Sequence, residues 1–176
     1  MLFRSNDVSL AEDSFRRALS IYPKAANVQH NYGWLLCQNG RMAESQRLFN
    51  EAIANPTYGD RAKTWMTLGL CQVRDGNKAA AETSLARSYE LDAGNPITAY
   101  NLATLLFQRG ELTRAQFYVR RINNGELANA ESLWLGIKIE RRLDNRDAMM
   151  SLASQLKKRF PQSREAASFD RSAFDE

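Results

Sequence analysis

Three glycines, Gly40, Gly76 and Gly110, each follow one predicted helix and precede another. The residues around them recur at matching offsets, because Tyr32-Gly33, Leu68-Gly69, Leu102-Ala103 and Leu135-Gly136 are separated by 36, 34 and 33 residues. A nearly constant period of this size indicates an array of helical repeats in which each unit buries the next. We therefore expect a binding scaffold rather than an enzyme built around one pocket.

The residues of each unit follow a known repeat pattern. Trp65, Leu68-Gly69, Gly76, Ala81 and Leu85 stand where the tetratricopeptide repeat has its Trp, Leu-Gly, Ala and large apolar residue. The second helices carry related triplets, which are Ala11/Phe15/Ala18, Ser45/Phe49/Ala52, Ala81/Leu85/Ser88, Ala115/Val119/Ile122 and Ala148/Leu152/Gln155. The chain thus resembles tetratricopeptide proteins, which implies an all-α superhelix of antiparallel helix pairs.

Helix-stop residues divide the chain. Pro23, Pro56, Pro96 and Pro161 fall where second helices should end, and Asn123-Asn124-Gly125 reads as a left-handed stop at the remaining boundary. The expected helices are 6–21, 27–39, 42–54, 61–74, 78–91, 97–109, 112–123, 128–142, 145–159 and a tail helix from about 162. We expect a single domain over 1–176, with a partial first repeat at 1–25, repeats at 26–60, 61–95, 96–127 and 128–160, and the C-terminal tail helix at 161–176.

The first residues match the end of a repeat's first helix and the turn after it, over Leu2-Phe3-Arg4-Ser5-Asn6-Asp7. The rest of that helix is missing, and the segment resembles neither a signal peptide nor a membrane span. Either the natural protein begins with an uncapped repeat, or upstream sequence has been lost. The second explanation is favoured, because terminal repeats normally have a polar outer face and this one would expose Phe15.

Catalytic and nucleic-acid-binding signatures are missing from the sequence. There is no Gly-rich phosphate loop, no Cys-x-x-Cys and no His-Glu-x-x-His, and His30 is the only histidine. His30 and Cys37 share a helical face, but no orienting third group accompanies them, so we expect no enzyme, no cofactor and no metal. The net charge of +4 comes from Lys and Arg interspersed with Asp and Glu, so we expect no nucleic-acid partner.

A helical-wheel analysis of the first helices predicts a binding groove. One stripe must face the partner helix of the hairpin, and a second stripe lies about 135° away from it. The second stripe is apolar and aromatic across three units, and its candidate groove residues are His30, Trp34, Met66, Leu70, Val73, Tyr100, Thr104 and Phe107. Its fourth-unit counterparts are Leu133, Ile137, Glu140 and Arg141. Such a surface suits an extended apolar segment or an amphipathic helix, although the same positions could simply be core.

The two cysteines, Cys37 and Cys71, lie in successive first helices and point in nearly opposite directions on the wheel. Parallel neighbouring helices face each other through opposite sides, so these thiols could meet across the junction. We favour a disulfide, which needs an oxidising compartment and close Cα atoms. Two reduced, buried thiols remain the alternative.

Longer segments of the sequence restrict the resemblance to one family among the tetratricopeptide proteins. The segments that matter are Asn31-Tyr-Gly-Trp-Leu-Leu-Cys37 with Gly40-Arg-Met-Ala-Glu-Ser45, Leu68-Gly-Leu-Cys71, Ser132-Leu-Trp-Leu-Gly-Ile-Lys138 with Asn145-Arg-Asp147, and Gln155-Leu-Lys-Lys-Arg-Phe-Pro161. Together they resemble the PilW/PilF type IV pilus biogenesis lipoproteins. The resemblance implies a periplasmic pilotin, lipid-anchored in the outer membrane, that helps the secretin PilQ reach that membrane and assemble. Other pilus-assembly proteins are further candidate partners. The family's signal peptide and lipid-bearing cysteine are not among these residues, so the resemblance puts membrane attachment outside this sequence.

Three classes of function are compared on this basis. A pilotin-like pilus assembly factor is the leading one. A generic tetratricopeptide adaptor, which would bind an apolar or amphipathic peptide of some other partner, is the alternative. An enzyme or enzyme subunit is the least favoured, because the sequence lacks the chemistry.

Overall fold

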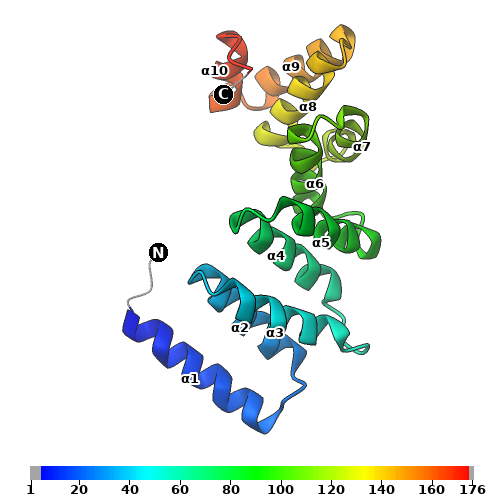
Figure 1. Ribbon diagram of the computed structural model, residues 1–176. Helices are drawn as coiled ribbons and strands as arrows, with labels where there is room; N and C mark the ends of the chain where they lie inside the picture. The colour runs from blue at the N-terminus through cyan, green and yellow to red at the C-terminus, as the bar shows by residue number, and fades with distance from the viewer. Residues whose placement is uncertain (1–4, 175–176) are drawn as a thin grey trace. The chain divides into compact units, whose positions relative to one another are not determined.

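The computed structural model describes residues 5–174, and every regular element in that range is an α-helix (Figure 1). The helices are α1 (Ser5–Ile21), α2 (Ala26–Gln38), α3 (Met42–Ala54), α4 (Arg61–Arg74), α5 (Lys78–Leu91), α6 (Pro96–Gln108), α7 (Leu112–Asn123), α8 (Ala130–Arg142), α9 (Arg146–Arg159) and α10 (Arg164–Asp170). The expected all-α class is confirmed, and the helix ends agree with the expected ones to within two residues. The chain divides into two compact units, unit 1 ending at Ala93 and unit 2 beginning at Gly94.

The helices pack as hairpins within each unit. In unit 1, α2 pairs with α3 and α4 with α5, while α1 packs on α2. In unit 2, α6 pairs with α7 and α8 with α9, while α10 packs on α8 and α9. The first helices also touch their neighbours, α2 against α4 and α6 against α8. This is the stacking that the repeat spacing predicts.

The tight turns inside three hairpins need a left-handed residue. Gly40, Gly76 and Gly110 have φ values of 75°, 81° and 82°, where an L side chain is strained. In the fourth hairpin Asp144 takes that place with a φ of 56°. Gly125 was wrongly expected to be a left-handed stop. The chain leaves α7 through Asn124 in the right-handed region, and the longer loop to α8 requires no left-handed turn.

Polar side chains cap the N-termini of several helices. Asn77, Asn95, Asn145 and Ser163 each accept a hydrogen bond from a backbone N–H in the first turn of their helix, and so satisfy a donor that has no partner in the helix. Asn129 and Ser132 form a reciprocal capping box at the start of α8. Pro96, expected near the end of a second helix, is the first residue of α6, where its fixed φ fits and no N–H is needed.

In unit 1, the two helices of each hairpin pack closely together at a glycine. A Cβ added at Gly69 of α4 would lie 2.6 Å from Leu85 Cγ of α5, and one at Gly33 would lie 3.1 Å from the Phe49 ring. Leu85 and Phe49 are fully buried, so each fills the space that its glycine leaves open. Trp65 packs, partly buried, against the cluster that contains Phe49 and Leu68.

The described part of unit 2, residues 94–174, contains two apolar clusters and one buried carboxylate. One cluster lies between α6, α7 and α8, and the other brings α8, α9 and α10 together. Glu140 on α8 is 1% exposed and accepts hydrogen bonds from Gln116 and Arg120 of α7 and from Asn145 ahead of α9. A buried charge is tolerated only when it is paired in this way, so Glu140 joins three helices.

The expectation for the first residues is tested only in part. Residues 2–4, expected to end a preceding helix, lie outside the described residues. The helix expected over 6–21 begins at Ser5 as α1, so the last residues of the segment are helical.

Candidate functional site

Four apolar side chains of α2 and α4 make up the unit 1 patch: Trp34, Met66, Leu70 and Val73. Trp34 is 39% exposed and the other three are half-buried. Met66, Leu70 and Val73 follow one another at four and three residues, so they lie on one face of α4. This part of the expected groove is therefore accessible to a partner, as a core position would not be.

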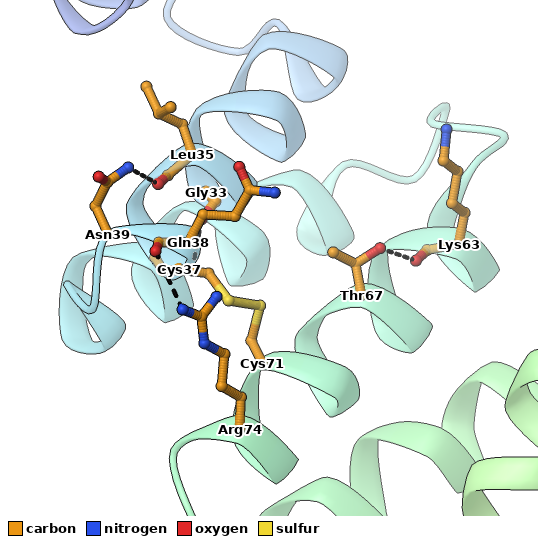
Figure 2. Close-up of a disulfide and its surroundings, with 10 residues drawn as sticks. Gly33, Leu35, Cys37, Gln38, Asn39, Lys63, Thr67, Cys71 and Arg74 are labelled. Carbon is orange, nitrogen blue, oxygen red and sulfur yellow. Dashed lines mark hydrogen bonds between the residues drawn. A yellow bond between two sulfur atoms is a disulfide. The ribbon is translucent and has the colours of Figure 1, made fainter. Parts of the chain in front are cut away.

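A disulfide joins α2 and α4 (Figure 2). Its cysteines lie close in sequence to the unit 1 patch, because Cys37 follows Trp34 by three residues and Cys71 follows Leu70 directly. The Cα atoms of Cys37 and Cys71 are 6.0 Å apart, so of the two alternatives left open by the sequence the structure shows the bridge. Next to it, a guanidinium nitrogen of Arg74 donates to the backbone oxygen of Gln38 at 3.3 Å, as Figure 2 shows. A cation suits this position because the carbonyls at a helix C-terminus carry partial negative charge.

His30, expected on the groove surface, is buried instead. It is 6% exposed, its Nδ1 lies 2.8 Å from Thr64 Oγ1, and its ring meets Phe49 edge-on at 5.7 Å. Burial lowers the pKa of His30, the charge of Lys63 lowers it further, and that of Asp60 opposes both. The packing of α4 against α2 covers the face of α2 that carries His30. The imidazole therefore links two helices instead of facing a partner.

The second accessible site is the unit 2 pocket, a cavity of about 280 Å³ between α6, α8 and α10. Tyr100, Thr104 and Phe107, the three groove residues expected on α6, all line it. The other lining residues are Gln108, Glu131, Trp134, Leu135, Lys138 and Glu165. The side chains of Tyr100, Thr104 and Phe107 are half-buried.

Cations surround the aromatic side chains of the unit 2 pocket. Lys138 Nζ lies 5.9 Å from the Phe107 ring centre and 5.7 Å from that of Trp134. The Arg142 guanidinium stands 5.0 Å from the Phe107 ring centre. Phe174 stacks on Trp134 at 5.4 Å, so the C-terminal segment covers part of the tryptophan. The pocket therefore combines flat apolar walls with a basic end.

The sequence of this chain is similar to those of known tetratricopeptide-repeat proteins. A family model described as the tetratricopeptide repeat matches residues 1–60 and 33–96. The type IV pilus assembly protein PilF of Pseudomonas aeruginosa is 31% identical over 160 residues, which are 91% of this chain and 64% of the relative. The chain thus spans just under two thirds of the length of that protein.

Solved structures agree with the sequence match. A structure of Pseudomonas aeruginosa PilF has a TM-score of 0.80 at 30% identity, over 94% of this chain and 75% of that one. The crystal structure of PilW, a widely conserved type IV pilus biogenesis factor, has a TM-score of 0.75 at 35% identity, over 90% and 73%. The chain belongs to the PilF/PilW family of tetratricopeptide-repeat proteins. The tetratricopeptide protein YrrB, at 16% identity over 94% and 84% with a TM-score of 0.76, shares the fold alone.

In this PilF/PilW family member, α10 changes the role of the fourth unit. Leu133 and Ile137 were expected to line the groove, but both are fully buried and pack in a cluster with Ala166 of α10. Glu140, expected beside them, is buried in its own polar network. The short tail helix covers the face that a further repeat would cover, so these positions become core.

On α8, the residues that line the pocket lie one position further along, although Trp134 itself is only 8% exposed. Trp134 and Lys138 line the unit 2 pocket in place of Leu133 and Ile137. The sequence carried a signal for them, since Glu131, Trp134, Leu135 and Lys138 recur at three- and four-residue steps on one helical face. The Leu135-Gly136 pair alone does not show which face of α8 lines the pocket.

Over the described residues of this family member, no three metal-binding side chains come together, and no helix is long and apolar enough to cross a membrane. The unit 1 patch and the unit 2 pocket expose apolar, aromatic and charged side chains, which are suited to contacts with other proteins.

Proposed function

We propose that this protein is a type IV pilus biogenesis factor of the pilotin kind, which binds the outer-membrane secretin PilQ and promotes its localisation and multimerisation. The observation that carries the proposal is the match to PilF and PilW in both sequence and structure over at least nine tenths of the chain. The tetratricopeptide fold supports a role in protein contacts rather than in catalysis.

The unit 1 patch is the part of the surface that we assign to the secretin. Trp34 is the largest exposed side chain on α2, and a large aromatic is the residue type that most often anchors an interface. The disulfide between α2 and α4 keeps Trp34 and Leu70 on helices that cannot separate. A preformed surface of this kind loses less conformational entropy on binding. An apolar or amphipathic segment of the secretin fits it.

The disulfide supports a periplasmic location, since such a bond persists in an oxidising environment such as the bacterial periplasm. Association with the outer membrane is part of the proposal and rests on the resemblance to PilF and PilW. Because Cys37 and Cys71 are bonded to each other, attachment by an N-terminal lipid would require a further cysteine.

Replacing Trp34 by Ala tests the assignment of the unit 1 patch. We expect the complex with purified secretin to weaken by about 2 kcal/mol or more if Trp34 is an anchor, with unchanged helical content by circular dichroism. Binding would be measured by surface-bound titration of the secretin or its fragments. In cells that carry the variant, heat-resistant secretin multimers would be counted in parallel.

Phe117→Ala is the matched control, because Phe117 is 58% exposed on α7, a second helix outside both candidate sites. Charge changes at Lys157 or Arg159 should also leave binding unaffected. Equal binding by wild-type protein, Phe117→Ala and a folded variant that lacks Trp34, Leu70, Tyr100 and Phe107 would move the secretin site elsewhere. Absence of any binding to the secretin by the folded wild-type protein would favour a generic tetratricopeptide adaptor with another partner.

A further inference from the structure

The unit 2 pocket contains two acidic side chains. Glu131 lies in the first turn of α8 and Glu165 in the first turn of α10, and both line the pocket beside Tyr100 of α6. The ion pairs that the structure shows in unit 2 use other carboxylates, those of Glu111, Glu140 and Asp170. The charges of Glu131 and Glu165 are therefore available to a ligand.

The phenol of Tyr100 lies within electrostatic range of both carboxylates. Burial raises the pKa of Tyr100, and the negative charges of Glu131 and Glu165 add to that increase, while a hydrogen bond with Thr104 opposes it. Glu131 and Glu165 come from different helices, so the packing of α10 on α8 is what brings them to one pocket.

Charge is distributed unevenly along the pocket. On α8, Glu131 and Lys138 are seven residues apart, which is about 10 Å along a helix, and Trp134 lies between them on the same face. Lys138 stands over the rings of Phe107 and Trp134, so the end of the pocket away from Glu131 is already basic. A ligand with a positive charge fits beside Glu131 and Glu165 and is repelled from the other end.

The pocket is small enough to be filled by one side chain. Its volume of about 280 Å³ is at the lower end of the roughly 300–1,000 Å³ that is usual for ligand pockets. Long basic side chains pack their methylene groups on apolar surface while the charged end stays with polar groups. The half-buried Tyr100 and the small accessible edge of Trp134, next to two carboxylates, offer both kinds of contact.

We propose that the unit 2 pocket binds a basic side chain of the protein partner, arginine better than lysine, with the cation between Glu131 and Glu165 and the methylene groups against Tyr100 and Trp134. Arginine is preferred because its planar guanidinium can donate to two carboxylates at once and can stack on an aromatic ring. This inference deepens the proposed function, in that it rests on the partner being a protein. It adds an acidic contact to a pocket whose other end is basic.

The test uses two synthetic peptides, acetyl-Ser-Leu-Arg-Leu-Ser-amide and the same peptide with glutamine in place of arginine. Each would be titrated into the ¹⁵N-labelled full chain, and amide shifts would be followed by NMR. We expect the arginine peptide to shift amides of α6, α8 and α10, and to bind at least about tenfold more tightly than the glutamine peptide, since a hydrogen bond to a charged group contributes about 1.5–3 kcal/mol. A lysine version should fall between them.

The variant Glu131→Gln/Glu165→Gln should remove the difference between the arginine and glutamine peptides. Glutamine keeps the shape of each side chain, and circular dichroism would verify the fold. Glu126→Gln is the matched control, because Glu126 is an exposed carboxylate of unit 2 outside the pocket. The control should retain the preference for arginine.

Three outcomes would overturn the proposal. These are equal affinity for the two peptides, an arginine preference that survives in Glu131→Gln/Glu165→Gln, and equal shifts at equal concentration from arginine amide alone, which would indicate a site for free cations. Failure here is separate from failure of the proposed function. Loss of secretin binding in Trp34→Ala is measured with a different ligand on a different unit, and either result can stand without the other.

Discussion

Gly110 and Asp144 occupy the same left-handed position in successive hairpins of unit 2, with φ values of 82° and 56°. An L residue costs up to about 1–2 kcal/mol in this region, less for Asp than for most. The exposed Asp144 therefore carries backbone strain that the other three hairpins avoid with glycine.

Asp144→Gly should stabilise the protein for this reason. We expect the free energy of unfolding to rise by up to about 1 kcal/mol, because the relief of strain outweighs the extra freedom of glycine in the unfolded chain. Urea unfolding followed by circular dichroism measures it. Asp144→Ala separates the two explanations: it removes the carboxylate and keeps the strain, so a gain equal to that of Asp144→Gly would show that charge, and not φ, is the cause.

Gly69→Ala should destabilise the α4–α5 hairpin. The new methyl group would lie 2.6 Å from Leu85 Cγ and 3.3 Å from the backbone oxygen of Ala81, so the helices must move apart, at a cost of about 1–3 kcal/mol. Thermal and urea unfolding give the value. Gly59→Ala is the control, because a Cβ there meets nothing within 4 Å.

The double variant Gly69→Ala/Leu85→Ala tests the mechanism of that loss. If the methyl group and Leu85 compete for one space, the double variant should lose less stability than the sum of the two single variants. Simple additivity would mean that Gly69 matters for a reason other than its contact with Leu85.

Reduction of the Cys37–Cys71 bridge should lower the free energy of unfolding by about 3–4 kcal/mol, the chain-entropy value for a loop of this length. The two residues are 34 apart in sequence. Urea curves with and without reductant would be compared for the wild type and for Cys37→Ala/Cys71→Ala. Only the wild type should respond to reductant. A wild-type curve that reductant leaves unchanged would contradict a stabilising bridge.

Stability should depend on pH through His30. Because burial lowers the pKa of the folded imidazole, the unfolded chain binds a proton more readily, and stability falls as pH drops below the unfolded value of about 6.5. The stability is complete above that value. The free energy of unfolding at pH 7.5 and pH 5.5 would be compared in wild type and His30→Gln. The decrease on acidification should be smaller in the variant, whatever the substitution costs at pH 7.5, and equal decreases would count against this role of His30.

The fold could be predicted well because residues with distinctive backbone preferences mark the ends of its helices. Gly40, Gly76 and Gly110 mark turns that only glycine adopts easily, and these fixed the helix ends nearby. The wheel also placed Cys37 and Cys71 on facing sides, since that argument needs only the direction of each side chain.

The candidate site was harder to predict because exposure depends on what else packs nearby. His30 lies at the edge of the strip, and the wheel could not show that the neighbouring helix covers it. Leu133 and Ile137 are buried by α10, a seven-residue helix too short to show a clear apolar period. Glu131 and Glu165 are brought together only by the packing of that helix.

The bond between α2 and α4 also governs how unit 1 opens. In a linear array each hairpin can detach after losing only its nearest neighbours, so amide protons usually exchange in small local steps. Here α3 lies inside a covalent ring closed by Cys37 and Cys71, and the hairpins on both sides of the bond cannot separate without unfolding together. We therefore expect their amides to exchange as one cooperative block, and the surface carrying Trp34 and Leu70 to last as long as that block stays closed.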